Sequence, residues 1–334
     1  MEHYLMKDLL AKIEGVSALV VGDPMLDHYI WGDSERISPE APVPVIDVSM
    51  DTYVAGGAAN VALNVAALSK KTQMAGYIGR DDAGLRLRSI LQEFDVRYHH
   101  CYEEDRQAST ILKTRVVVRN QQLCRLDRES SPAEYIINEA GYEKYVLPCL
   151  DNVDVVILSD YAKGVISEVF VKRLIKDAKS KGVFVAMDPK PKRQIDFSGV
   201  SLLTPNRAES LQLADIHLSR HESYPYEQVC KKIWEKYHPE NLIVTLGAEG
   251  MMTSREGKVI DVIPTKVREV FDVSGAGDTV IATLALALAA EAVLEDAANL
   301  ANVAAGVVVG KLGTAIVKPQ EILAYSSNSK DIIA

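Results

Sequence analysis

Short apolar runs and amphipathic stretches alternate along most of the 334-residue chain. Apolar runs typical of buried strands occur at residues 17–22, 72–78, 153–159, 183–187, 201–204 and 242–245. Apolar residues at helical spacing lie between them, at about 57–68, 82–94, 165–180, 206–213 and 224–237. Strands that alternate with helices predict an α/β fold with a mostly parallel, doubly wound sheet and helices on both faces.

Two segments break this alternation. Residues 43–54 and 110–127 are rich in strand-forming residues, alternate in polarity and lack crossover helices. We expect them to form a small separate sheet, and the alternative is that they are edge strands of the main sheet. No internal repeat, low-complexity run or long linker divides the chain. Residues 1–334 are therefore expected to form one domain with the small sheet attached.

Composition narrows the class of protein. An apolar content of 48% and a charged content of 25% are ordinary for a globular protein. The net charge of −9 argues against nucleic-acid binding as the main task. The sequence has neither a membrane-spanning apolar run nor a signal-peptide pattern at its start, and its four cysteines are scattered. We expect a cytoplasmic protein without nucleic-acid or membrane partners.

The segment Asp272-Val-Ser-Gly-Ala-Gly-Asp278 carries the strongest chemical signal. The Ala- and Leu-rich run that follows predicts a helix beginning at this turn. Gly275 and Gly277 let backbone N–H groups converge at the helix N-terminus, where the helix dipole favours an anion. A carboxylate beside such a site suits phosphoryl transfer to a hydroxyl group. The alternative is a simple strand-to-helix turn with an acidic residue.

Two separated motifs make the chain resemble the ribokinase-like (PfkB) carbohydrate kinases. One is the 272–278 segment, which fits the pattern D-[TV]-x-G-A-G-D, and the other is Gly56-Gly57-Ala-Ala-Asn60. The resemblance implies a ribokinase-like fold in which Asp278 is the catalytic base and Gly275, Ala276 and Gly277 form the anion hole. It also implies that the small sheet is a lid over the sugar site, and we expect a homodimer formed through this lid.

Further segments resemble the heptose 7-phosphate kinases of ADP-heptose biosynthesis. They lie at residues 20–27, 36–45, 119–122, 158–164 and 306–314. The resemblance implies phosphorylation of C1 of D-glycero-β-D-manno-heptose 7-phosphate to the 1,7-bisphosphate, for lipopolysaccharide core biosynthesis. The alternatives are a kinase of another sugar or sugar phosphate and a non-catalytic sugar-binding module. We expect the kinase alone, because little sequence follows Leu323 for a fused nucleotidyltransferase.

Candidate sugar-binding residues follow from the same resemblance. Asp27 follows the first strand, where carboxylates meet ligands in doubly wound sheets. Gly56 and Gly57 allow close backbone approach, and Asn60 can donate and accept hydrogen bonds as a diol requires. The substrate's phosphate needs cations, and the candidates are Lys113, Arg115, Arg119, Lys163, Lys190 and Arg193. Arg119 and Lys190 are favoured because their flanking segments resemble those of the heptose kinases.

The nucleotide end of the site is also implied by the family. Asn206-Arg207-Ala208-Glu209 matches an Asn-x-x-Glu element that orders Mg²⁺ and its waters, so Glu209 is the candidate metal residue, acting through water. The same residues fit a helix capping box, and both roles are compatible. Thr245, Gly247 and Gly250 resemble a loop that contacts ATP, and Asn302 resembles a position beside the adenine. The expected cofactors are ATP and Mg²⁺, with a monovalent cation such as K⁺ near Asp272 and residues 310–313.

Overall fold

The computed structural model describes residues 3–102, 106–119, 121–193, 195–219, 222–265, 271–311 and 313–327. Its strands are β1 (Ser17–Gly22), β2 (Pro24–Ile37), β3 (Pro44–Gly57), β4 (Lys71–Gly76), β5 (Arg97–His100), β6 (Ile111–Val118), β7 (Gln121–Arg128), β8 (Val155–Ser159), β9 (Phe184–Asp188), β10 (Leu202–Leu203), β11 (Asn241–Thr245), β12 (Met251–Arg255) and β13 (Lys258–Ile263). Its helices are α1 (His3–Ile13), α2 (Ala58–Leu68), α3 (Asp82–Glu93), α4 (Glu139–Gly141), α5 (Glu168–Ser180), α6 (Arg207–Leu213), α7 (Tyr226–Tyr237), α8 (Ala276–Ala289), α9 (Leu294–Val308) and α10 (Pro319–Ser327). Short helical turns are η1 (Pro132–Tyr135), η2 (Tyr142–Val146), η3 (Leu147–Asp151), η4 (Pro191–Arg193) and η5 (Gly247–Glu249).

The main sheet has the predicted α/β architecture. Its strand order is β13-β12-β11-β10-β9-β8-β1-β4-β5. The pairs from β11 through β5 are all parallel, and the two pairs that β12 forms, with β11 and with β13, are antiparallel. Every apolar run that predicted a strand lies in this sheet. The expected mostly parallel sheet is therefore confirmed.

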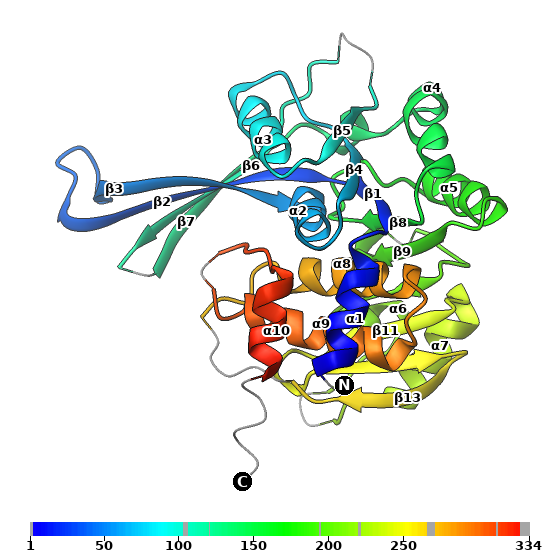
Figure 1. Ribbon diagram of the computed structural model, residues 1–334. Helices are drawn as coiled ribbons and strands as arrows, with labels where there is room; N and C mark the ends of the chain where they lie inside the picture. Colours follow the sequence, from blue (N-terminus) through cyan, green and yellow to red (C-terminus); the bar gives the residue numbers. More distant parts are fainter. Residues whose placement is uncertain are drawn as a thin grey trace.

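Helices cover both faces of this sheet, as the predicted doubly wound arrangement requires (Figure 1). In β1, Ala18 and Val20 belong to one buried cluster, whereas Leu19 and Val21 belong to another. The first cluster contains side chains of α1, α2, α3, α8, α9 and α10, and the second contains those of α5 and α7. The two sets of side chains alternate because successive residues of a strand point to opposite faces. Within the described ranges, no helix is long and apolar enough to cross a lipid bilayer.

Helix α8 is the element that brings the two family motifs together. Its small and apolar side chains are almost all buried, and it packs against α2 and α9. It begins after Gly275, whose φ of 78° lies in the left-handed region that glycine adopts without strain. This close packing places the first turn of α8 beside Asn60 of α2.

A second sheet forms the lid and has the order β3-β2-β6-β7. It extends well beyond the body of the molecule (Figure 1). The strands predicted at 43–54 and 110–127 correspond to β3 and to the β6–β7 hairpin, so the interpretation as a separate sheet is confirmed. Strand β2 was not predicted, because its later half contains Gly, Asp, Ser and Glu, which are poor strand formers.

Helices α1 and α10 lie side by side at the lower edge of the molecule (Figure 1). His3 Nδ1 and Ser326 Oγ are 3.1 Å apart although 323 positions separate the two residues. The start and the end of the described chain therefore meet on one surface.

Candidate active site

The candidate site lies where neighbouring parallel strands end. Strands β1, β8, β9, β10 and β11 are adjacent in the sheet, and their carboxyl ends lead to Asp23, Tyr161, Lys190, Asn206 and Thr245. A cavity of about 180 Å³ at this edge is lined by Tyr161, Asp188, Lys190, Thr204, Asn206, Glu209, Thr245, Gly275, Gly277, Asp278 and Val280. Ligands of doubly wound sheets bind at this edge.

Asp278 is the buried carboxylate of this cavity, and its side chain accepts two short hydrogen bonds. The Tyr161 hydroxyl donates to Oδ1 at 2.6 Å, and Asn60 Nδ2 donates to Oδ2 at 2.7 Å. Burial raises the pKa of Asp278 to about 6, although both donors act in the opposite direction. Each oxygen keeps a second lone pair, so the carboxylate can still accept a proton.

The first turn of α8 forms the other wall. Gly275 and Gly277 line the cavity, and Ala276 lies between them outside its lining. An ideal Cβ on Gly277 would meet no heavy atom of the described residues within 4 Å, so the backbone there is open to a ligand. The N–H groups of Gly277 and Asp278 have no acceptor within the helix and can bind an anion beside the Asp278 carboxylate, whereas the Ala276 N–H donates to the Val273 carbonyl at 3.3 Å.

Asn60 occupies a different place from the expected sugar contact. Its side chain is turned to Asp278, and only 1% of the residue is exposed. Asn64 Nδ2 donates to the Asn60 carbonyl at 3.0 Å, and the Thr279 hydroxyl donates to Asn64 Oδ1 at 2.8 Å. In this structure Asn60 therefore belongs to a buried network that supports the carboxylate of Asp278.

Asp27 and Gly56, both predicted to bind the sugar, meet at the end of the lid that joins the body. An ideal Cβ on Gly56 would lie 2.3 Å from Asp27 Oδ2, so no larger residue fits there. Gly57 has a φ of 56°, and its Cβ would lie 2.5 Å from the Asp23 carbonyl oxygen. Arg115 donates a short hydrogen bond to Asp27 Oδ1. The two glycines thus allow the lid to join the body beside Asp27.

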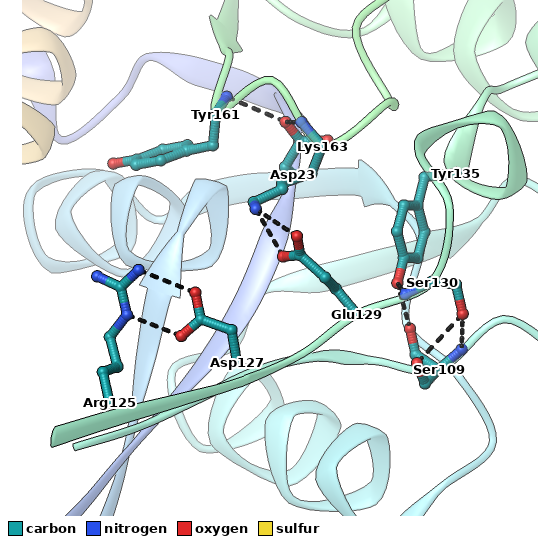
Figure 2. Close-up of polar contacts among 9 residues, drawn as sticks. All are labelled: Asp23, Ser109, Arg125, Asp127, Glu129, Ser130, Tyr135, Tyr161 and Lys163. Atoms are coloured by element: carbon teal, nitrogen blue, oxygen red, sulfur yellow. Dashed lines mark hydrogen bonds and ion pairs between the residues drawn. The ribbon is translucent and has the colours of Figure 1, made fainter. Parts of the chain in front are cut away.

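Four cations gather near this end, and we call Lys113, Arg115, Arg125 and Lys163 the lid-base cluster. Lys113 pairs in register with Asp27 on one side and Asp127 on the other, but Arg115 and Arg125 bind those carboxylates. Figure 2 shows the Arg125–Asp127 pair and the ion pair of Lys163 with Glu129. Burial lowers the pKa of Lys113, and the charges of Lys163 and Arg125 add to this effect, so that the carboxylates of Asp27 and Asp127 offset it only in part. This ammonium group is therefore poorly compensated by the protein.

The two cations favoured by the sequence lie elsewhere. Arg119 lies six residues beyond Lys113, which is roughly 20 Å along a strand. Its side chain is 69% exposed and lies 3.5 Å from Asp33. Lys190 does line the cavity, but its Nζ is 2.6 Å from Glu209 Oε1. Thus Arg119 is remote from the cavity of its own chain, and Lys190 lies beside the nucleotide motif.

The Asn206–Glu209 segment forms a complete capping box at the start of α6. Asn206 Oδ1 accepts from the N–H groups of Ala208 and Glu209, both at 2.9 Å. Glu209 Oε2 accepts from the Asn206 N–H at 3.0 Å. Arg207 points to Glu249 instead of the cavity lining. The capping interpretation is confirmed, and Asn206 and Glu209 also face the cavity.

The other nucleotide-loop residues differ in accessibility. Thr245 lines the cavity and forms a β-bridge with Asn206. Gly247 has an open Cβ position, whereas a Cβ on Gly250 would lie 2.0 Å from the Ile263 carbonyl oxygen. Asn302 is buried, and its amide donates to the Pro264 carbonyl at 2.7 Å. Asn302 therefore holds the backbone in place rather than presenting a free amide.

Sequence reasoning missed Tyr161 as the partner of Asp278. The residue lies in the 158–164 segment, which was used only for its resemblance. Its place directly after a strand of the predicted sheet was the available signal. Its contact with Asp278 joins residues 117 positions apart, so no local pattern reveals it.

Comparisons with known proteins agree with this geometry. The profile of the pfkB family carbohydrate kinases matches residues 17–321. The bifunctional protein HldE of Shewanella amazonensis is 44% identical over 322 residues, which cover 95% of this chain and 65% of that protein. HldE of Geobacter metallireducens is 41% identical over 331 residues, covering 97% and 65%. The chain spans 63–66% of the length of the curated HldE relatives that it matches.

Solved structures show the same fold. A ribokinase from Thermotoga maritima has a TM-score of 0.73 at 22% identity, with 94% of this chain and 100% of that chain covered. Phosphofructokinase-2 from Escherichia coli in complex with potassium has a TM-score of 0.74 at 18% identity, with 94% and 99% covered. The profile match, the relatives and the geometry lead to one conclusion: this chain belongs to the pfkB family of carbohydrate kinases.

Proposed function

We propose that the protein uses ATP to phosphorylate the C1 hydroxyl of D-glycero-β-D-manno-heptose 7-phosphate. The product would be the 1,7-bisphosphate, a precursor of ADP-heptose for lipopolysaccharide. The observation that carries the proposal is the buried Asp278 beside the open first turn of α8, between Asp27 and the Asn206–Glu209 motif. The segments that resemble heptose kinases and the HldE relatives support this substrate.

Asp278 acts as the general base in this proposal. It takes the proton of the C1 hydroxyl as the C1 oxygen attacks the γ-phosphorus of ATP. The bond between that phosphorus and the β–γ bridging oxygen breaks, and ADP leaves. The N–H groups of the first turn of α8 stabilise the charge on the transferred phosphoryl group. The pKa of about 6 keeps Asp278 ionised at neutral pH while leaving it a stronger base than an ordinary Asp.

The cavity fits a divalent cation bound with the nucleotide. Burial, with the nearby carboxylates of Glu209 and Asp278, raises the pKa of Asp188 well above its ordinary value, and a bound divalent cation would favour the ionised form of this group. The described residues contain no group of three His, Cys, Asp or Glu side chains that could hold a metal. Asp188 and Glu209 would therefore hold hydrated Mg²⁺ that also contacts ATP phosphates, as Mg²⁺ prefers. When bound, Mg²⁺ neutralises phosphate charge.

A monovalent cation near Asp272 stays a prediction. The Asp272 carboxylate accepts from the N–H groups of Ser274 at 2.9 Å and Gly313 at 3.1 Å, so it joins the two segments implicated by the sequence. Leu312 lies outside the described residues. Measuring activity with K⁺ replaced by tetramethylammonium would test this part separately.

The lid-base cluster supports a phosphorylated acceptor. Its cations lie around Asp27, the expected partner of the sugar hydroxyls. The Lys113 ammonium lies 6.0 Å from the ring centroid of Tyr161, whose hydroxyl binds Asp278. One aromatic ring therefore separates this cation from the base. A sugar that places C1 at Asp278 can direct its distal phosphate toward Lys113, where charge-assisted hydrogen bonds are available.

We also propose that the lid forms a homodimer. Exposed apolar side chains lie on its two edge strands: Val48 and Met50 on β3, and Leu123 and Leu126 on β7. Edge strands with exposed apolar residues are prone to pair with another chain. A second copy would cover both the free strand edges and the apolar side chains.

The decisive test of the proposed function is the reaction itself. Purified protein is incubated with MgATP and, separately, with heptose 7-phosphate, heptose, fructose 6-phosphate and ribose. We expect an anomeric phosphate signal in ³¹P NMR with heptose 7-phosphate, and a kcat/KM at least about tenfold above that for heptose. Turnover of a different sugar alone would assign another sugar kinase. Absence of ADP release with every acceptor would favour a non-catalytic sugar-binding module.

A further inference from the structure

The turn between β8 and α5 is held by an unusual number of bonds. Asp23 is completely buried, and its Oδ2 accepts from the N–H groups of Tyr161 and Lys163, both at 3.0 Å (Figure 2). Asp23 Oδ1 accepts from the Val165 N–H, also at 3.0 Å. Three backbone donors on one carboxylate fix the course of residues 161–165.

A second carboxylate reinforces the same turn. Asp160 Oδ1 accepts from the Ala162 N–H at 2.8 Å and from Arg193 Nη2 at 3.0 Å. Ala162 has a φ of 58°, a left-handed conformation that costs energy for a residue other than glycine. Two buried carboxylates therefore hold one turn, and this turn contains a residue in a strained conformation. Backbone strain of this kind is typical of functional sites.

This turn positions the side chain of Tyr161. Figure 2 shows its ring directed away from Asp23. Two ammonium groups lie near the ring, with Lys113 Nζ 6.0 Å and Lys190 Nζ 5.9 Å from its centroid. Its hydroxyl donates to Asp278 Oδ1 at 2.6 Å. The turn that Asp23 and Asp160 hold therefore places the Tyr161 hydroxyl against Asp278, the proposed base.

We infer that Tyr161 is a positioning residue for phosphoryl transfer, whose hydroxyl orients the Asp278 carboxylate and keeps it ionised. Its effect on rate rests on the proposed function, but its effect on Asp278 does not. Among the described residues, Asn60 is the only other side chain that donates a hydrogen bond to this carboxylate, and it binds the opposite oxygen. Tyr161 therefore determines how Oδ1 is presented.

The charges around Asp278 explain why one hydroxyl matters. Burial and the carboxylate of Asp27 raise its pKa, and Asp188 is a further acid that interacts with it. Lys190 and the donors Tyr161 and Asn60 lower it, and the balance lies at about 6. Loss of one donor to a charged group corresponds to about one pKa unit or more. Such a loss would move the pKa to neutrality or above, where much of the base is protonated.

The test is Tyr161→Phe, which removes one oxygen and keeps the aromatic ring near the two lysines. Because proton abstraction needs the carboxylate, kcat/KM of the wild type should rise with pH through about 6. In Tyr161→Phe this rise should move upward by about one unit or more, and kcat at pH 7 should fall about tenfold or more. Raising the pH to 8.5 should recover part of the loss.

Tyr142→Phe is the matched control. The Tyr142 hydroxyl donates to Asp177 Oδ2 at 2.8 Å, the same type of bond, and neither residue lines the cavity. Tyr142 is 2% exposed, so the control also removes a buried hydroxyl. Its pH profile should match that of the wild type. A Tyr161→Phe profile that coincides with the control, at whatever kcat, would overturn the inference.

A titration without substrate separates this inference from the proposed function. ¹³C-carboxyl-labelled aspartate, with Asp278 assigned by comparison with Asp278→Asn, reports the pKa of Asp278 in the ligand-free protein. An upward shift in Tyr161→Phe supports the inference even if no tested sugar is phosphorylated, in which case only the proposed function fails. An unchanged Asp278 titration would contradict the inference even if the kinase is active.

Discussion

At Asp278, burial and hydrogen bonding act in opposite directions, and burial prevails. Burial is the largest influence on the pKa of this carboxyl group, and it outweighs the donors Tyr161 and Asn60. The result is a pKa of about 6 instead of 3.8. A base with this pKa is largely ionised at pH 7 and is far better matched to a hydroxyl proton than an exposed aspartate.

Replacing Asp278 with Asn should reduce kcat by about 10²–10⁴, the usual range for loss of a general base. The amide keeps the shape but cannot take the proton, so KM for the sugar should change little. Steady-state kinetics at saturating MgATP measure both values. Asp177→Asn is the control, because it makes the same change at a carboxylate that accepts from a tyrosine hydroxyl but does not line the cavity. Activity of Asp278→Asn within a few-fold of wild type would remove Asp278 from the mechanism.

Glu209→Gln separates two roles of one side chain. Gln can still accept from the Asn206 N–H, so the capping box should persist and the melting temperature should change little. The lost charge should raise the Mg²⁺ concentration for half-maximal activity several-fold, because one hard carboxylate near the hydrated metal is gone. A magnesium titration of initial rates measures this. If the curve is unchanged, Glu209 serves only the cap and its ion pair with Lys190.

Strand β6 and the turn after it direct two cations to different surroundings. Lys113 on β6 lies beside Asp27 and near Tyr161, whereas Arg119, directly after the end of β6, lies next to Asp33. The sequence could identify both as cations in a lid, but only the strand register places them.

Lys113→Ala should raise KM for heptose 7-phosphate about tenfold or more, using about 1.4 kcal/mol per decade, and KM for ATP should change less. Arg119→Ala, directly after the end of β6, should leave KM for the sugar phosphate within about twofold. Both variants are compared on heptose and heptose 7-phosphate. If Arg119→Ala raised KM for heptose 7-phosphate more than Lys113→Ala did, the phosphate contact would be assigned to Arg119. That Arg119 would then have to belong to a second copy of the chain.

The sequence predicted elements better than it predicted contacts. Apolar runs located the strands of the main sheet, because buried parallel strands are apolar on both faces. Strand β2 was not predicted, because the half of the strand that extends into the lid is polar and lacks this pattern. The motif at 272–278 revealed Asp278, but its partners Asn60 and Tyr161 are 218 and 117 positions away. Such pairings depend on which strands become neighbours, which local patterns do not contain.

On the scale of the whole molecule, the lid is the part whose shape suits a partner. Its four strands reach beyond the body, and its edge strands β3 and β7 carry exposed apolar side chains (Figure 1). Because apolar surface exposed to water is unfavourable, burying it against a second copy would contribute to association.

Leu126→Asp should convert the proposed dimer into a monomer, because a charge in the interface would be buried without a partner. Leu126 is 61% exposed in the single chain, so its own fold should tolerate the change. Sedimentation velocity measures the mass of each variant. Val169→Asp on α5 is the control, since Val169 is also exposed but lies outside the lid. A wild-type protein that sediments as a monomer would contradict lid dimerisation.

Because α1 and α10 are in contact, the order of the elements along the chain could be changed without changing the fold. Because His3 and Ser326 already touch, a short linker could join these helices without moving either. The chain could then be opened at the tight turn between β12 and β13, where Glu256 and Gly257 lie on the surface. A circularly permuted protein of this design would keep every sheet pairing described above. It would also place its new termini away from both the lid and the cavity, which makes that hairpin a suitable attachment point for a fluorescent reporter.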